Sequence, residues 1–106
     1  MLGDADEDCP PVPVPDGALL REMPIINKRG LHARASAKFV QTVERFRADV
    51  TVTRCGETVG GRSIMGLLTL GAAKGTTIAV TALGTDAEAC LDGIAALLAN
   101  RFGEDE

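Results

Sequence analysis

The fold of this chain is decided by residues 49–60, which read DVTVTRCGETVG. Over residues 49–54 valines alternate with threonines, and this period of two is typical of a strand with one buried face. The next residues, Cys55, Gly56 and Glu57, have the composition of a tight turn, after which residues 58–60 return as a short strand. Strands joined by so short a turn pair in antiparallel fashion, so the sheet is at least partly antiparallel.

Strands and helices alternate on both sides of this hairpin. We expect a strand over 18–26 that lies at a sheet edge or ends at Pro24, because proline has no N–H for a central ladder. Apolar residues at helical spacing predict an amphipathic helix over 33–46. The remaining predicted elements are a short helix between an N-cap at Ser63 and a C-cap at Gly71, a strand over 76–83, and a last helix that Thr85 caps. The order βαββαβα predicts the α+β class, with helices on one face of a mainly antiparallel sheet.

Length and composition exclude several classes of protein. The 106 residues suit one domain, and 45% of them are apolar, too many for a disordered chain. No apolar run approaches the roughly 18–20 residues that span a bilayer, so we expect no membrane insertion. The three cysteines are odd in number and lack metal-ligand spacing, which predicts neither a disulfide nor a zinc site and favours a reducing cytoplasm.

The charge divides the chain into three parts. Residues 1–17 hold five acidic residues, no basic residue and four of the five prolines, which predicts a disordered or extended leader. Residues 18–102 form the predicted domain, and residues 103–106 are a short acidic tail. Within the domain, residues 28–47 carry six basic residues against the single acidic Glu44, on a chain whose net charge is −4. We interpret this basic cluster as a surface that attracts acidic partner proteins rather than nucleic acid, because no nucleic-acid motif accompanies it.

The single histidine, His32, lies where a loop containing Gly30 becomes the helix over 33–46. A histidine in this position is most often a cap or a surface residue. The unpaired N–H groups of the first helical turn nevertheless make an anion site, and Arg34 adds a guanidinium suited to phosphoryl oxygens. A neutral imidazole is a competent nucleophile, so the segment predicts phosphoryl transfer without metal or cofactor. No Asp or Glu lies close to His32 in sequence to act as an orienting partner, so nothing here supports a Ser-His-Asp site or a metal-dependent hydrolase.

Two segments carry a resemblance to a known family. Residues 27–34, NKRGLHAR, resemble the active-site signature of the HPr family of phosphocarrier proteins of the phosphoenolpyruvate-dependent phosphotransferase system, and residues 62–67, RSIMGL, are similar to its second signature. The resemblance implies an open-faced β-sandwich, in which three helices cover one side of a four-stranded antiparallel sheet. It implies that Enzyme I phosphorylates His32 at Nδ1, that Arg34 stabilises the phosphate, and that a IIA-type protein receives the phosphoryl group.

The resemblance also implies secondary sites and one departure. Ser63 corresponds to the position that a regulatory kinase, the HPr kinase/phosphorylase, modifies in some branches, although a serine at this point is also an ordinary N-cap. Ala35 stands where the family usually has proline, which loosens the first turn and restores one N–H. The residues expected to contact phosphate or partners are Gly30, Ala33, Ala35, Met65 and Leu68. We expect a monomer.

Alternatives remain open at this point. The tail and the Asn-Lys pair at 27–28 are similar to the nitrogen-related branch of the family, whereas residues 62–66 look more like the sugar branch. The protein could therefore act mainly as a regulator that controls partners according to its phosphorylation state. A third interpretation is a small-molecule-binding α+β module in which His32 is only a helix cap.

Overall fold

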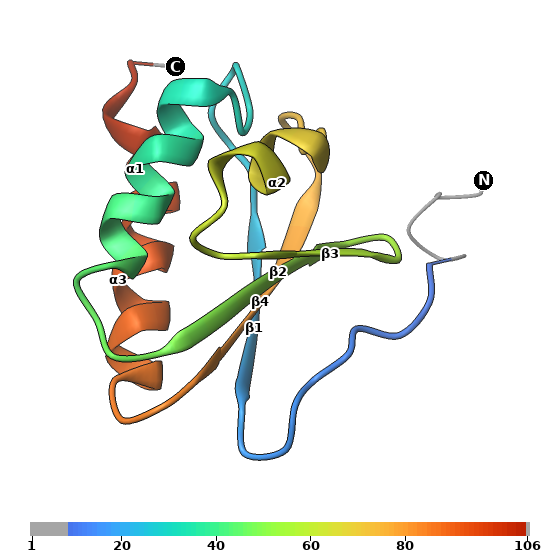
Figure 1. Cartoon of the computed structure of the whole chain (residues 1–106). Helices are drawn as coiled ribbons and strands as arrows, with labels where there is room; N and C mark the ends of the chain where they lie inside the picture. Colours follow the sequence, from blue (N-terminus) through green and yellow to red (C-terminus); the bar gives the residue numbers. More distant parts are fainter. Residues whose placement is uncertain (1–8, 106) are drawn as a thin grey trace.

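The computed structural model describes residues 9–105, which form one sheet with helices on one face (Figure 1). The strands are β1 (Leu19–Pro24), β2 (Asp49–Arg54), β3 (Glu57–Gly60) and β4 (Thr77–Leu83). The helices are α1 (Ala33–Val43), α2 (Ile64–Thr69), α3 (Ala87–Ala99) and the single 3-10 turn η2 (Arg101–Gly103). The strand order is β1-β4-β2-β3 and every neighbouring pair is antiparallel, which confirms the predicted α+β open-faced sandwich.

The register follows from the valine–threonine alternation. Val52 of β2 lies opposite Val80 of β4 and Val59 of β3, so valines from the central strands share the face that the helices cover. The threonines fall on the other face, where the hydroxyls of Thr51 and Thr81 lie 2.5 Å apart. β1 is an edge strand that ends at Pro24, as its proline predicts.

Three helix boundaries differ from the sequence predictions, and the smallest difference is at α2, whose C-cap is Leu70 instead of Gly71. α1 ends at Val43 instead of 46, because the next residues turn while Phe46 still packs on the core from outside the helix, against Gly93 of α3. α3 begins at Ala87, with Asp86 rather than Thr85 at the N-cap. The carboxylate of Asp86 accepts a hydrogen bond from the backbone N–H of Arg47, so it ties α3 to the turn before β2 instead of capping its own helix.

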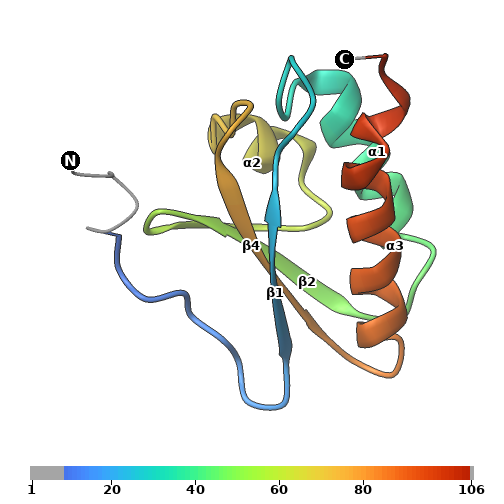
Figure 2. The same cartoon turned by 180° about the vertical axis from the view of Figure 1, so that it is seen from behind.

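The cysteines correct one expectation. Cys9 and Cys55 form a disulfide bond, where the cysteine count and spacing predicted none. Residues 9–17 run along the side of the sheet opposite α1 and α3 (Figures 1 and 2), and Val12 is half-buried there. The disulfide ties the start of this segment to the hairpin between β2 and β3, residues 9–17 contain no helix or strand, and residues 1–8 lie outside the described residues. A pairing across 46 positions has no spacing signal, which is why the sequence did not reveal it.

No helix within residues 9–105 is long and apolar enough to cross a membrane. The core is aliphatic apart from two fully buried phenylalanines, Phe39 on α1 and Phe102 on η2. Phe102 matters for the site because it anchors the end of the chain next to the start of α1, where the two segments lie together in both views (Figures 1 and 2).

Candidate functional site

The loop before α1 is held in place by a contact that only glycine permits. Gly30 has φ +65°, and a Cβ atom there would lie 2.4 Å from the carbonyl oxygen of Ala72. The next residue, Leu31, donates its backbone N–H to that same oxygen at 2.9 Å and buries its side chain. The loop is thus pinned to the segment between α2 and β4, and His32 emerges at the N-cap position of α1.

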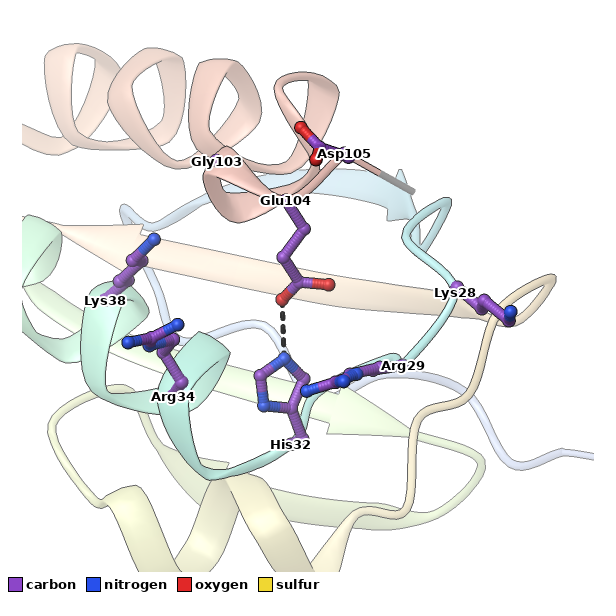
Figure 3. Close-up of a pocket in the computed structure, with 8 residues that line it drawn as sticks. All are labelled: Lys28, Arg29, His32, Arg34, Lys38, Gly103, Glu104 and Asp105. Atoms are coloured by element: carbon purple, nitrogen blue, oxygen red, sulfur yellow. Dashed lines mark hydrogen bonds and ion pairs between the residues drawn. The ribbon is translucent and has the colours of Figure 1, made fainter.

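His32 does not act as a helix cap through its side chain. Its imidazole makes no capping hydrogen bond, which removes the main support for interpreting it as a structural cap. Instead, Nε2 lies 2.5 Å from a carboxylate oxygen, Oε2 of Glu104 (Figure 3). The side chain of His32 is 24% exposed and that of Glu104 is 19% exposed, so the pair is partly shielded from water. No acidic residue lies close to His32 in sequence, and the carboxylate that contacts its ring comes from 72 residues further along the chain.

Asn27 connects the loop to this pair. It is fully buried, and its Nδ2 donates to the carbonyl oxygen of Gly30 at 2.9 Å and to Oε1 of Glu104 at 3.1 Å. One amide therefore holds both the turn that positions His32 and the carboxylate that contacts its ring.

The tail reaches the ring because of a backward turn after α3. Arg101 and Phe102 both have φ 54°, a left-handed conformation that is uncommon for residues other than glycine. Burial of the Phe102 side chain holds this turn, and the Nζ atom of Lys38 donates to the carbonyl oxygen of Phe102 at 2.5 Å. Glu104 consequently belongs to the site rather than to a separate acidic tail.

The surrounding cleft is strongly basic. It has a volume of about 720 Å³, and Figure 3 shows Arg29 and Arg34 on opposite sides of the His32 ring. Its lining residues are Lys28, Arg29, His32, Arg34, Lys38, Gly103, Glu104 and Asp105. Four basic side chains against two carboxylates leave the cleft suited to an additional anion.

The pKa of the Glu104 carboxyl lies below its ordinary value. Desolvation raises this pKa, but the hydrogen bonds from His32 and Asn27 and the charges of His32 and Arg29 outweigh that effect. Glu104 is therefore ionised near neutral pH and acts as a hydrogen-bond acceptor.

The first turn of α1 contributes backbone donors as well as the side chain of Arg34. It contains no acidic residue, and its leading N–H groups belong to residues 33–35, which precede the first intrahelical bond. Arg34 is exposed and lines the cleft, and Ala33 is exposed beside it. The side chain of Ala35 is completely buried, so this residue can face an anion only through its backbone N–H.

The second segment singled out in the sequence lies apart from the cleft. Ser63 caps α2, since its Oγ accepts the backbone N–H of Gly66 at 2.9 Å. On this helix Met65 is 70% exposed and Ile64 is 40% exposed, whereas Leu68 is half-buried. No residue of α2 lines the cleft around His32, although α2 packs against α1. The two segments therefore present neighbouring surfaces.

Sequence reasoning missed Asn27 and Glu104 as members of the site. Asn27 looked like an ordinary turn residue, and Glu104 looked like one acid among several at the chain end. The available signal was Phe102, a large apolar residue just beyond the last helix, since an apolar residue in that place tends to be buried and to fold the tail back.

Comparisons with known proteins agree with this geometry. Residues 20–100 match the family described as "PTS HPr component phosphorylation site". The chain is 47% identical over 88 residues to proteins named Phosphocarrier protein HPr from Cupriavidus necator and from Neisseria meningitidis serogroup A, a match that covers 83% of this chain and 99% of each relative. A crystal structure of HPr-C-His from Thermoanaerobacter tengcongensis superimposes with a TM-score of 0.79 at 35% identity, covering 83% of this chain and 99% of that one. This chain belongs to the HPr family of phosphocarrier proteins of the phosphotransferase system.

Proposed function

We propose that this protein carries a phosphoryl group on Nδ1 of His32, accepting it from phospho-Enzyme I and passing it to a IIA-type protein. The observation that supports this most is the position of His32: a half-buried imidazole at the start of α1, inside a cleft with four basic side chains. The protein is phosphorylated and dephosphorylated once per transfer, so it is a stoichiometric carrier rather than an enzyme.

Each neighbouring group has a role in this proposal. The free electron pair of the imidazole forms the bond to phosphorus, while the bond from phosphorus to the donor breaks and its electrons leave with the donor. The phosphoryl oxygens accept hydrogen bonds from the first N–H groups of α1 and from the guanidinium of Arg34. Arg29, on the other side of the ring, adds positive charge, and Gly30 exposes the ring by fixing the loop.

Partner docking is proposed for the surface formed by the start of α1 and by α2. Met65 and Ile64 supply exposed apolar area there, and Leu68 adds a partly covered edge. A carrier must release each partner quickly, and a small apolar contact with basic surroundings suits a charge-steered, short-lived complex. The proposed role requires the protein to work in the cytoplasm, together with Enzyme I.

Regulation is proposed at Ser63, with the HPr kinase/phosphorylase as the modifying partner. Phosphate at this helix N-terminus adds about −1.5 to −2 charge beside the docking surface. It repels an acidic partner without unfolding α2, because an anion is favourable at a helix start. Ser63→Asp tests this: it retains the cap, and we expect slower phosphorylation by Enzyme I at unchanged thermal stability. Unaltered Enzyme I kinetics would count against the regulatory role.

The experiment that tests the carrier function uses phosphoenolpyruvate and purified Enzyme I of the sugar and nitrogen types. Intact mass should show one added phosphate that is lost in acid, and His32→Ala should show none. The phosphorylated protein is then incubated with candidate IIA-type proteins. The one that removes the phosphate fastest identifies the branch. Absence of phosphate with both types of Enzyme I would overturn the proposal.

A further inference from the structure

We propose that Glu104 is a positioning residue that holds the His32 proton on Nε2 and so leaves the electron pair of Nδ1 free for the phosphoryl group. The inference rests on the proposed function only in that Nδ1 is the atom to be phosphorylated. The state of the ring itself follows from contacts among three side chains, and it can be measured without any phosphotransferase protein.

The hydrogen that lies between His32 and Glu104 can be bonded to only one of the two residues. An ionised carboxylate accepts hydrogen bonds and donates none, and the pKa of Glu104 is held below its ordinary value. Nε2 and Oε2 lie 2.5 Å apart, so a hydrogen must lie between them, and it belongs to Nε2. The neutral ring then has its electron pair on Nδ1. In Figure 3 this second nitrogen points away from Glu104, on the side of the ring where Arg34 lies.

Asn27 fixes which atoms of residue 104 face the ring. Its Nδ2 donates both to the carbonyl oxygen of Gly30 and to Oε1 of Glu104. If the amide of Asn27 were reversed, its oxygen would face the carbonyl oxygen of Gly30, and both hydrogen bonds would be lost. Because Asn27 is fully buried, water does not replace them. The oxygen of Glu104 that faces Asn27 must therefore remain an acceptor.

The other charged groups around the ring do not duplicate this role. Lys38 is engaged with the carbonyl oxygen of Phe102. Arg29 and Arg34 cannot accept a hydrogen bond, and neither can Lys28, which points away from the ring. Asp105 lines the same cleft, but its side chain also points away from His32 (Figure 3). Among residues 9–105, Glu104 is the one carboxylate that forms a hydrogen bond with the His32 ring.

The same contact assists the transfer step. When Nδ1 forms its bond to phosphorus, the donor leaves with the electron pair of the broken bond and the ring becomes positively charged. The ring keeps its hydrogen on Nε2, and the adjacent carboxylate compensates the new charge. When the phosphoryl group leaves, the electron pair returns to Nδ1 and the ring becomes neutral in the same tautomer.

The sharpest test is Glu104→Gln, because this substitution should invert the tautomer. The amide oxygen of the glutamine must face Nδ2 of Asn27, which donates. Its NH₂ group then faces Nε2 of His32 and donates to it, so the ring hydrogen moves to Nδ1. Glu104→Ala instead leaves Nε2 to water and imposes neither tautomer. A purely structural role predicts the opposite ranking, since glutamine preserves the shape of the side chain and alanine does not. Asp105→Asn removes the same charge from the same cleft without touching the ring and serves as the control.

Two measurements separate these outcomes. Nitrogen-15 NMR of the unphosphorylated proteins reports which ring nitrogen of His32 carries hydrogen. Phosphorylation by phosphoramidate, a small nitrogen–phosphorus donor that loses ammonia, reports the reactivity of Nδ1. We expect Glu104→Gln to place the hydrogen on Nδ1 and to react about tenfold or more slowly, because about a tenth or less of the rings would then have the electron pair free on Nδ1. Glu104→Ala should be impaired less, and Asp105→Asn should keep the wild-type tautomer and react no more slowly than the wild type.

The proposal is overturned if the hydrogen stays on Nε2 in Glu104→Gln, or if that variant reacts faster than Glu104→Ala. A mixture of tautomers in the wild-type protein would overturn it as well. Failure of the carrier function gives a different result. In that case the wild type and its variants show the expected tautomers, but Enzyme I transfers no phosphate to any of them.

Discussion

The ammonium group of Lys38 on α1 donates a hydrogen bond to the backbone oxygen of Phe102, which lies 64 residues later in η2. This bond joins the helix that begins at His32 to the turn that leads into Glu104. The nucleophile and its carboxylate partner are therefore held by one piece of local structure, and loosening that structure should affect them together.

Phe102→Ala is the first prediction. The ring is 1% exposed within the core, and removing a buried phenylalanine costs about 3–5 kcal/mol. We also expect the hydrogen bond between His32 and Glu104 to be lost, because the backward turn loses its anchor. Urea unfolding measures the loss of stability, and the NMR signal of the Nε2 hydrogen measures the loss of the hydrogen bond.

Lys38→Met should weaken the His32–Glu104 contact with a much smaller loss of stability. An intact contact in Phe102→Ala would show that the tail is held by something else.

Gly30→Ala is the second prediction, and Gly71→Ala is its matched control. The two glycines have nearly the same φ, +65° and +62°, so alanine suffers the same left-handed backbone penalty of about 1–2 kcal/mol at either position. A Cβ at residue 30 would also lie 2.4 Å from the Ala72 oxygen, whereas a Cβ at residue 71 meets nothing within 4 Å. Gly30→Ala should thus be clearly less stable in chemical denaturation and should displace His32. Equal losses of stability would mean that the loop relaxes away from Ala72.

The sequence predicted those features that depend on neighbouring residues. The alternation of Val50 and Val52 with threonines fixed the strand and its buried face, and Ser63 marked the start of α2 through its own side chain. His32 was predicted at the start of α1 and lies at its N-cap. Each of these depends on periodicity or capping chemistry that operates within a few residues.

The remaining features depend on contacts between distant parts of the chain. Glu104 reaches His32 only because Arg101 and Phe102 adopt a left-handed turn, which neither residue favours by itself. The pairing of Cys9 with Cys55 depends on how the leader runs over the sheet. Such contacts become visible only when the tertiary structure brings the segments together, so local patterns could not indicate them.

Acid sensitivity is the third prediction. The pKa of the Glu104 carboxyl is lower in the folded protein than its ordinary value of 4.5, so the ionised form is favoured by folding. The resulting stability is fully present above that ordinary value and is lost as the pH falls through the lower, folded-state pKa. Wild type should exceed Glu104→Gln in free energy of unfolding at pH 6, and the difference should shrink steadily below about pH 4.5. Denaturation at a series of pH values measures it, with Asp105→Asn as the reference. A difference that does not change with pH would show that the charge of Glu104 contributes nothing.

The disulfide between Cys9 and Cys55 is the subject of the last prediction. It closes a loop of 46 residues, and a bond of this span stabilises a fold by about 2–4 kcal/mol. Reduction should therefore lower the melting temperature, and Cys9→Ser should have the same effect and then be insensitive to reductant. The sheet and helices should persist after reduction, since the hydrophobic core contains no residue of the leader segment 9–17.

The third cysteine, Cys90, is an internal control. It is buried, and burial raises the pKa of its thiol, so it should react slowly with alkylating reagents in both states. Phosphorylation of His32 should proceed equally in both redox states, because neither Cys9 nor Cys55 lines the cleft around the ring. A melting temperature that is unaffected by reductant would show that residues 9–17 contribute no stability through this bond.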